Sequence, residues 1–516
     1  MNAEERLKQA NESFARGDFK AAAQAFHDVI KLHPDIGELY INLGAALKAS
    51  GDIPGAEQAY RDAIKKIPKS AIAWFNLGNL LRETKHGEEA LKAYRKADKL
   101  QPGTPEILNN LGSQLYDLGA IEDAVKHYDA ALSFRPTFAD AMTNRGNALQ
   151  RLCRMDEAEL ALRDALAVES MNPVFTLNMS AFMAATGQHD QAIEWADKAI
   201  ALDLNYIDAH LKKASLLIQQ GQLKDGFSLY ETRWQNPNWH PLPAKLDAQP
   251  WNGEDLSGKH LIVWNEQGYG DAIMYVRFIN DLANHAARLT IMCEPTLHTL
   301  LSRNVPENIT FIALNDVTPT ADFHVSMMSL PHHFGVTLNN LKPEMPYLVP
   351  DKGASGKWRK TFTSNILQVG IIWAGNPGQS HDYSRSLTPK VISPVLDTPN
   401  TKFHNLLFGP RGDLWRDDRL IDPRRKLKTF DDTAAYMDAL DLVISVDSAP
   451  AHLAAAIGKK TWVLLSFDPD TRYFLGRNDN PWYPTMTLYR QQAPGEWASV
   501  IAQTCSNLKN LQSQKK

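Results

Sequence analysis

The chain has 516 residues, a formal net charge of -4 and a sequence pI of about 6.5. This mild acidity excludes an overall basic field that would recruit nucleic acid or an anionic membrane surface. Hydrophobic residues make up 44% of the chain and charged residues 22%. These values are typical of a soluble globular protein, and the length predicts more than one domain.

The cysteines Cys153, Cys293 and Cys505 lie far apart and are odd in number. They predict neither a disulfide framework nor a metal cluster, so a reducing compartment fits best. The first residues form a polar amphipathic pattern rather than a signal peptide, and no apolar run is long enough to span a bilayer. We therefore expect a cytoplasmic protein without a transmembrane segment, a metal site or a cofactor.

The first half of the chain repeats with a period of 34 residues. The recurring sets are Pro34, Pro68, Pro102 and Pro136; Gly44, Gly78, Gly112 and Gly146; Phe26, Tyr60, Tyr94 and Tyr128; and Ala22, Ala56, Ala90, Ala124, Ala158 and Ala192. Small residues let two helices approach closely, an aromatic ring fills the space between them, and proline ends the second helix. Each unit is therefore expected to be a pair of helices.

This pattern resembles the tetratricopeptide repeat, most completely in AWFNLGNLLRETKHGEEALKAYRKADKLQP, residues 73–102. The resemblance implies an α superhelix of about seven repeats over residues 1–235, the last of them degenerate. Such arrays have a concave face that often holds peptides.

Asparagine recurs on the presumed concave face at repeat spacing. The positions are Asn42, Asn76, Asn79, Asn110 and Asn144, with Asn147 beside them. Because an amide both donates and accepts, it can pair with a peptide backbone, and these residues are the predicted peptide-binding set. The alternative is a solvated polar face on a scaffold, with the array serving as a contact between copies of the chain.

The pattern changes after residue 235. Residues 236–258 are rich in proline, tryptophan and asparagine and are expected to form a linker. Strands are predicted at 260–264, 288–294 and 309–314, then at 366–375, 402–409, 440–446 and 460–467, with helices at about 271–285, 295–303 and 495–510. This alternation predicts parallel sheets with covered faces. We expect two Rossmann-like halves, 259–350 and 351–516, that face a cleft.

Polar turns follow several of these strands, and open α/β sheets bind ligands at the carboxyl ends of their strands. In WNEQGYGDA, residues 264–272, Gly268 and Gly270 allow backbone amides to face a ligand, and Asp271 is expected to open a helix. Aspartate is also a preferred N-cap, so the alternative for Asp271 is a capping role alone.

Two further turns lie in the second half. The loop at 373–386 carries Gly375, Asn376 and Arg385, residue types that supply amides and a guanidinium to a diphosphate. The alternative is an ordinary exposed loop. Phe408, at the end of the predicted 402–409 strand, joins the nucleotide-sugar candidates.

The second of these turns lies in VISVDSAPAHLAAAIG. Asp447 and Ser448 follow a strand and His452 lies on the next helix, where they are suited to contact ribose and phosphate. The alternative for His452 is a structural histidine with its hydrogen bonds satisfied.

Together these turns resemble the ADP-heptosyltransferase-like glycosyltransferases, family nine, over about residues 259–505. The matching segments are GYGDA, WAGNP, DDTAAYMDALDLVISVDSAPAHLAAAIG and PDTRYFLGRNDNPWYPTMTLYRQ. YETRW, LPHHFGVTL and NPWYP are similar to a bacterial subgroup that joins tetratricopeptide repeats to this half. That layout is also similar to the O-GlcNAc transferases, which glycosylate proteins.

The resemblance implies a GT-B fold, a nucleotide-sugar donor held mainly by the second half without a divalent metal, and Asp271 as the general base. His381 is the next candidate base. Our leading hypothesis is a glycosyltransferase that modifies an acceptor, plausibly a protein, selected by the repeats. One alternative is transfer to lipopolysaccharide or a lipid-linked sugar. The other is a non-catalytic repeat scaffold for protein–protein interaction.

Overall fold

The computed structural model describes residues 3–236, 239, 246–341, 345–379 and 382–514. Residue contacts divide the chain into two compact units, residues 1–182 and 183–516. The division falls inside helix α11 (Pro173–Ala185).

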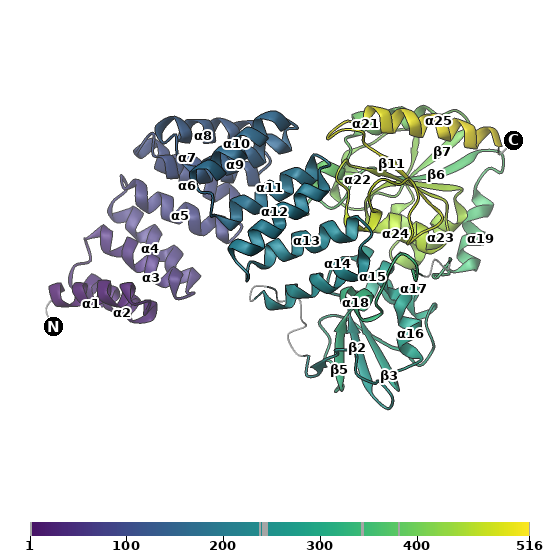
Figure 1. Cartoon of the computed structure of the whole chain (residues 1–516), viewed down its shortest axis with the longest axis horizontal. Coiled ribbons are helices and arrows are strands. Elements are labelled where there is room, and N and C mark those ends of the chain that lie inside the picture. Colours follow the sequence, from purple (N-terminus) through teal and green to yellow (C-terminus); the bar gives the residue numbers. More distant parts are fainter. Residues whose placement is uncertain (1–2, 237–238, 240–245, 342–344, 380–381, 515–516) are drawn as a thin grey trace. The chain divides into compact units, whose positions relative to one another are not determined.

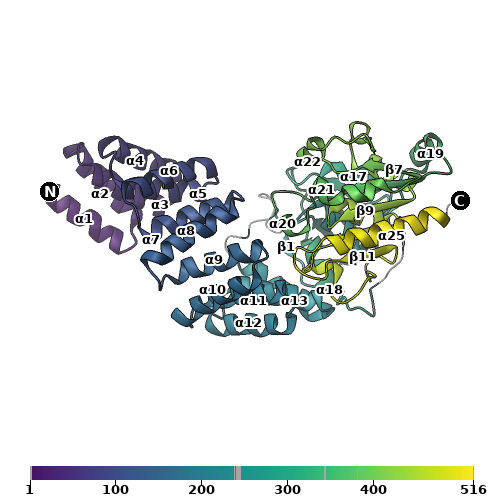
Figure 2. The same ribbon diagram turned by 90° about the horizontal axis from the view of Figure 1, so that it is seen from above.

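The first unit is a series of helix pairs, coloured purple to blue in Figure 1 and seen from a second side in Figure 2. The helices are α1 (Ala3–Ala15), α2 (Phe19–Leu32), α3 (Gly37–Ala49), α4 (Ile53–Lys66), α5 (Ala71–Glu83), α6 (Gly87–Leu100), α7 (Pro105–Asp117), α8 (Ile121–Phe134), α9 (Ala139–Arg151) and α10 (Met155–Val168). Each helix packs on the next along the chain. The unit is therefore the helical superhelix that the 34-residue period predicts.

The recurring glycine and aromatic residue set the distance between the helices of a pair. A Cβ atom at Gly44 would lie 2.6 Å from the ring of Tyr60, and one at Gly78 would lie 2.8 Å from the ring of Tyr94. Both tyrosines are 2% exposed or less. A larger residue at either glycine would push the pair apart, so the recurring glycine is a packing requirement of the repeat.

The second unit begins with helices and continues with two parallel sheets. Its first elements are α12 (His189–Leu202), α13 (Ile207–Gln219), α14 (Leu223–Tyr230) and the 3-10 helix η1 (Glu231–Gln235). Side chains of α13 and α14, including Ile218, Leu223 and Phe227, belong to the same buried core as the sheets. This shared core explains why these last helices group with the sheets rather than with the preceding repeats.

The two sheets contain only parallel strand pairs among the described residues. The five-stranded sheet has the order β1 (Gln249–Pro250), β5 (Phe323–Ser326), β2 (His260–Trp264), β3 (Arg288–Met292) and β4 (Thr310–Ile312). The six-stranded sheet has the order β11 (Met486–Arg490), β10 (Thr461–Leu465), β9 (Leu442–Val446), β6 (Leu367–Ile372), β7 (Thr401–Asn405) and β8 (Leu420–Ile421). Every residue of β2, β6, β9 and β10 is buried, as parallel strands covered on both faces require.

Helices and short 3-10 segments connect the strands. They are α15 (Tyr269–Tyr275), η2 (Val276–Phe278), α16 (Ile279–Ala283), α17 (Pro295–Ser302), η3 (Met327–Ser329), α18 (Leu330–His333), α19 (Lys352–Thr361), α20 (Asp382–Arg385), α21 (Pro389–Ile392), η4 (Ser393–Asp397), α22 (Pro410–Leu414), η5 (Arg424–Lys426), α23 (Phe430–Ala439), α24 (Ala449–Ala456), η6 (Thr471–Tyr473) and α25 (Ala498–Gln514). The last helix, α25, packs against β11 and η4 (Figure 2).

The predicted strands are present, with ends that move by a few residues. The sequence pattern misses β1, β5, β8 and β11, which are short or not fully buried strands. The helix predicted at 271–285 is wrong as a single element, because it begins at Tyr269 and breaks into α15, η2 and α16. Arg277 lies in the 3-10 segment and donates from Nε to the carbonyl of Met274 at 2.8 Å, which uses a carbonyl at the end of α15.

A buried ion pair joins η1 to the turn that follows β2. Arg233 donates from Nε and Nη2 to both carboxylate oxygens of Glu266, at 2.8 and 2.9 Å. The side chain of Arg233 is 1% exposed and that of Glu266 is fully buried. Arg233 also donates to Glu231 at 2.6 Å and to Ser329 Oγ at 2.8 Å. Loss of the guanidinium would therefore leave a buried carboxylate without its cation.

We expect Arg233→Met to lower the free energy of unfolding of the second unit by about 3–5 kcal/mol, the usual effect of removing one partner of a buried pair. The measurement is urea unfolding followed by tryptophan fluorescence. The matched control is Lys259→Met, which breaks the exposed Lys259–Asp322 pair in the same sheet. That change should cost at most about 1 kcal/mol. Equal losses of unfolding free energy in the two variants would contradict the proposed contribution of the buried pair to stability.

Candidate functional site

The second unit contains a cavity of about 1040 Å³ at the carboxyl ends of strands from both sheets. Its walls are the turns that follow β2, β6, β7, β9 and β10, the first residues of α23, and one face of α13. Parallel strands bring such turns together at one edge of a sheet. We call this cavity, with the lining from these turns and from α13, the cleft.

The cleft brings together every described residue that the sequence singles out for the nucleotide sugar and for catalysis. These are Gly268, Gly270, Asp271, Gly375, Asn376, Arg385, Phe408, Asp447, Ser448 and His452. The remaining candidate base, His381, lies outside the described residues.

The turn after β6 is shaped around Gly375. A Cβ atom there would lie 2.6 Å from Arg385 Nη2 and 2.7 Å from Asp382 Oδ1, so a larger residue would have to displace these side chains. The Gly375 amide donates to Ser386 Oγ at 2.9 Å. Asn376 Oδ1 accepts the Gly378 amide at 3.0 Å, which orders the start of the loop. The turn is therefore a built feature of the cleft, with the Arg385 guanidinium at its edge.

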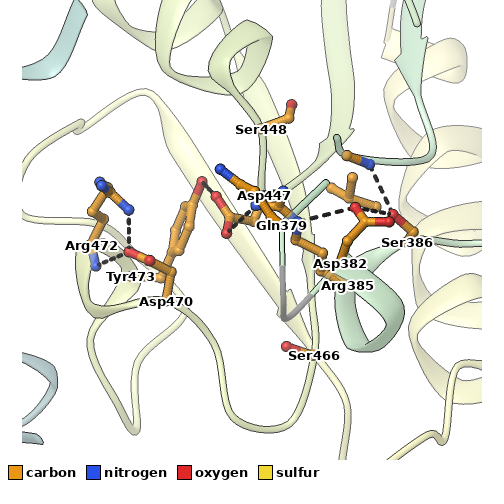
Figure 3. Close-up of polar contacts among 12 residues, drawn as sticks. Gln379, Asp382, Arg385, Ser386, Asp447, Ser448, Ser466, Asp470, Arg472 and Tyr473 are labelled. Carbon is orange, nitrogen blue, oxygen red and sulfur yellow. Dashed lines mark hydrogen bonds and ion pairs between the residues drawn. The ribbon is translucent and has the colours of Figure 1, made fainter. Parts of the chain in front are cut away.

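Arg385 and Tyr473 hold the carboxylate of Asp447 from opposite sides (Figure 3). Arg385 Nη1 lies 3.2 Å from Asp447 Oδ2, and the Tyr473 hydroxyl donates to Asp447 Oδ1 at 3.0 Å. Burial of Asp447 raises the pKa of its carboxyl, and the nearby charge of Asp470 raises it further, whereas Arg385 opposes this shift. The result is a buried polar group aimed at the cleft and held in one orientation.

Asp271 lies on α15, as the third residue of the helix and not as its first residue. Its Oδ2 atom accepts the Gly268 amide at 3.1 Å, which caps the helix and occupies that amide. Its Oδ1 atom pairs with Arg472 from the loop after β10. Asp271 is 6% exposed and lines the cleft. The carboxylate thus performs the capping role and also lies in the candidate site.

Arg472 is a site residue that the sequence reasoning misses. Its Nη1 atom lies 2.7 Å from Asp470 Oδ1 (Figure 3). Because Arg472 also pairs with Asp271, one guanidinium holds two carboxylates. It lies in η6, 201 residues from Asp271 along the chain. The local sequence DTR at 470–472 could have pointed to this short helical turn, because aspartate commonly caps such segments. Here Asp470 Oδ1 accepts the Arg472 amide at 3.0 Å.

His452 lies on α24 and is 2% exposed. Its Nδ1 atom is 3.1 Å from the Tyr483 hydroxyl, and its Cδ2 atom would lie 3.2 Å from a Cβ atom at Gly270. Burial, and then the charge of Arg472, lower the pKa of His452 to about 3. The imidazole is therefore neutral at physiological pH, and Gly270 leaves the room that it needs.

Ser448 is the N-cap residue of α24 and lines the cleft. Its hydroxyl shares a hydrogen bond of 2.8 Å with Ser445 Oγ. The amino end of a helix favours an anion, so this turn suits a phosphate group.

Aromatic side chains line another part of the cleft. Phe408 is 41% exposed and Tyr269 is 39% exposed. The ring of Tyr269 lies 4.9 Å from that of Phe430, centre to centre, and all three residues line the cleft. Exposed aromatic faces of this kind can stack on a planar base. Tyr269 and Phe430 are further residues that the motif analysis does not select.

The asparagines of the first unit bond partly to one another. Asn110 donates to Asn79 Oδ1 at 2.9 Å, which also accepts the Tyr94 hydroxyl at 2.8 Å. Asn144 donates to Asn109 Oδ1 at 2.9 Å. These amides therefore form hydrogen bonds between neighbouring repeats.

The remaining predicted asparagines differ from this ladder. Asn42 is exposed and Asn76 is half-buried, and neither makes a side-chain hydrogen bond to another described residue. Asn147 donates to Asn178 Oδ1 at 3.1 Å. The amides most available to a peptide are thus those of Asn42 and Asn76.

The described residues contain no group of three or more His, Cys, Asp or Glu side chains placed to hold a metal ion. Among the same residues, no helix is both long enough and apolar enough to cross a membrane.

Comparison with known proteins identifies the first part of the chain. The tetratricopeptide repeat family matches residues 7–71 and 42–105, and the TPR repeat family matches residues 112–152. The N-terminal region is therefore an array of tetratricopeptide repeats, followed by a domain with parallel sheets.

One curated relative is protein FlbA of Caulobacter vibrioides, 25% identical over 332 residues. The match covers 58% of this chain and 54% of FlbA, so the chain spans about half the length of the curated relative that it matches.

Several solved structures resemble part of the chain. A MamA protein is 23% identical over 33% of this chain and 92% of that chain, with a TM-score of 0.31. YrrB, described as a TPR protein with an unusual peptide-binding site, is 22% identical over 36% of this chain and 97% of that chain, with a TM-score of 0.31. A tetratricopeptide repeat protein from Parabacteroides merdae is 16% identical over 46% and 94% of the two chains, with a TM-score of 0.42.

We expect His452 to stay neutral in the folded protein from pH 8 down to pH 5, because its pKa is lowered from 6.5 to about 3. The unfolded chain takes up this proton near pH 6.5 and the folded chain only near pH 3, so the free energy of unfolding falls as the pH falls through this window. Long-range ¹H–¹⁵N spectra of histidine-labelled protein report the protonation state, and His452→Asn assigns the signal. Protonation of His452 above pH 5 would contradict the environment described.

Proposed function

We propose that the sheet-bearing part of the second unit is a GT-B glycosyltransferase of the ADP-heptosyltransferase-like kind, and that it moves a sugar from a nucleotide-sugar donor to an acceptor. One observation carries the proposal. Strand-end turns from both sheets line a single cleft of about 1040 Å³, and that cleft contains every described residue that the motifs select for nucleotide-sugar binding or catalysis. A cavity of this size accommodates a nucleotide sugar.

The donor's nucleotide belongs, in this proposal, to the turns of the six-stranded sheet. The planar base stacks on the exposed ring of Phe408, in the turn after β7, and the diphosphate lies near Arg385 and the amino end of α24. Asp447, held by Arg385 and Tyr473, accepts hydrogen bonds from ribose hydroxyls. These groups are oriented before a ligand arrives, so binding requires little side-chain ordering.

Asp271 is the proposed general base. The acceptor hydroxyl oxygen forms a bond to the anomeric carbon of the sugar while the bond from that carbon to the diphosphate oxygen breaks. The hydroxyl proton passes to Asp271, and the released diphosphate carries away the electron pair of the broken bond. Arg472 occupies one oxygen of Asp271, so acceptor binding must displace this contact. The charge that develops on the diphosphate is offset by Arg385 and by the amino end of α24.

The proposed acceptor is a protein or peptide bound by the repeats. Support comes from the tetratricopeptide array, a type of structure that generally binds other proteins, and from the available amides of Asn42 and Asn76. In this proposal the cleft catalyses the transfer, and the repeat array determines which acceptor is bound.

We expect Asp271→Asn to fold normally, to bind nucleotide with near-normal affinity, and to lower the rate by at least about a hundredfold, the lower end of general-base contributions. Asparagine keeps the size and an oxygen that can still accept the Gly268 amide, so the helix cap survives. The measurement is single-turnover release of nucleoside diphosphate from a saturating nucleotide sugar, with acceptor protein or with water as acceptor.

The matched control is Asp432→Asn. Asp432 is likewise the third residue of its helix, α23, and accepts the Thr429 amide at 3.0 Å, but it does not line the cleft. Its loss should cost about 1 kcal/mol of stability at most and leave the rate unchanged. If Asp271→Asn stays within a few-fold of wild type, Asp271 is a cap and the proposed mechanism is wrong.

A further inference from the structure

One face of α13 forms a wall of the cleft. Lys212, Ser215 and Gln219 all line it, at positions i, i+3 and i+7 of the helix, which lie on one side of a helix. The helix contacts η6, the segment that carries Arg472. The motif comparison draws no residue from α13, so this wall is an addition to the site.

Gln219 lines the cleft, and its amide group is held in place by two hydrogen bonds. Its Nε2 atom donates to the Pro469 carbonyl at 2.6 Å and to Asp468 Oδ1 at 3.1 Å. Gln219 is 5% exposed, and its Oε1 atom is buried without a hydrogen-bond donor among the described residues. A buried acceptor left unpaired costs about 1–3 kcal/mol, so a donor supplied by a ligand would remove a real penalty.

Lys212 is half-buried in the same wall and forms no ion pair with a described residue. Burial lowers the pKa of its amine, and the carboxylate of Asp468 acts in the opposite direction. An ammonium group in such a place is stabilised by an anion that comes close to it.

The arginines of the cleft are already paired, in contrast to Lys212. Arg385 pairs with Asp447, Arg411 with Asp382, and Arg472 with Asp271. An incoming anion therefore meets an amine in the α13 wall that no described carboxylate neutralises by direct contact.

We propose that the α13 wall is a ligand subsite in which Lys212 binds an anionic oxygen group of the donor, a phosphate or a sugar carboxylate, while Gln219 Oε1 accepts a hydrogen bond from a sugar hydroxyl. The identity of the ligand as a nucleotide sugar rests on the proposed function. In this subsite, helix α13 of the helical region becomes part of the sugar-nucleotide site, and changes in α13 alter donor choice.

The test compares Lys212→Met and Lys212→Arg with wild type by calorimetric titration. The matched control is Lys213→Met, because Lys213 is the next residue, pairs with Asp197 at 2.6 Å and does not line the cleft. The probes are nucleoside monophosphates and diphosphates of each base, together with UDP-glucose and UDP-glucuronate. We expect Lys212→Met to weaken the best anionic ligand at least tenfold, Lys212→Arg to stay within a few-fold, and Lys213→Met to match wild type.

The probes separate the two sources of the anion. If Lys212 binds the diphosphate, Lys212→Met lowers the affinity for nucleoside diphosphates and leaves the affinity for monophosphates unchanged. If Lys212 binds a sugar carboxylate, the variant lowers the affinity for UDP-glucuronate alone and leaves the affinities for the diphosphates and UDP-glucose unchanged. If wild type binds nucleotides and Lys212→Met binds every probe with the same affinity, the subsite is wrong and the proposed function still stands.

Failure of the proposed function gives a different result, because wild type would then bind no nucleotide. In that case the subsite is tested by acetylating the lysines with and without inorganic pyrophosphate or glucuronate. Mass spectrometry then measures the extent of acetylation of each lysine. Protection of Lys212 but not of Lys213 supports an anion subsite without a nucleotide site. Equal acetylation with and without both anions overturns the subsite as well.

Discussion

The buried pair between Arg233 and Glu266 is the contact on which the rest of the second unit depends. Arg233 ends the helical segment, and Glu266 lies in the turn between β2 and α15. Both charges are removed from water, so each requires the other, and the pair is favourable only because Glu231, Ser326 and Ser329 satisfy the remaining hydrogen bonds. The geometry of the turn that presents Asp271 is therefore tied to the end of the helical region.

A second set of contacts joins the same helices to the other sheet. Gln219 holds the carbonyl of Pro469, and the Leu475 amide donates to the carbonyl of Gln219 at 3.0 Å. Between these two points lies Arg472, which reaches Asp271. The cleft is thus built from three sources: the turn after β2 of the five-stranded sheet, several turns of the six-stranded sheet, and helix α13, which the repeat pattern would assign to the preceding array. Its arginines are paired with carboxylates of the chain itself, whereas Lys212 in the α13 wall has no such direct pair among the described residues.

The repeat array and the order of the main strands along the chain could be predicted from sequence, because both follow from local periodicity. A glycine that recurs opposite an aromatic ring can be recognised from spacing alone, and the contact of Gly44 with Tyr60 has this form. Strand-end turns are also local, so Asp271, Asp447 and His452 can be selected from the sequence alone. Their meeting in one cleft follows from the parallel order of the strands.

The rest of the site could not be read from sequence because it depends on distant contacts. Arg472 is recognisable only through its pairing with Asp271, and Lys212 only through the packing of a degenerate repeat against η6. The asparagine pattern shows the same limit. The spacing predicts amides for a peptide, but the bond from Asn110 to Asn79 joins neighbouring repeats and is visible only when the repeats are stacked.

The central claim is that the cleft binds a nucleotide, and a thermal-shift screen of nucleoside diphosphates and nucleotide sugars tests it most directly. A ligand at a hundredfold excess over its Kd stabilises the folded state by about 2.7 kcal/mol. We expect ligands of at least one base to raise the Tm by several degrees in wild type and to raise it much less in Asp447→Ala. If no nucleotide or nucleotide sugar raises the Tm, or if Asp447→Ala responds as wild type does, the cleft is not the nucleotide site described.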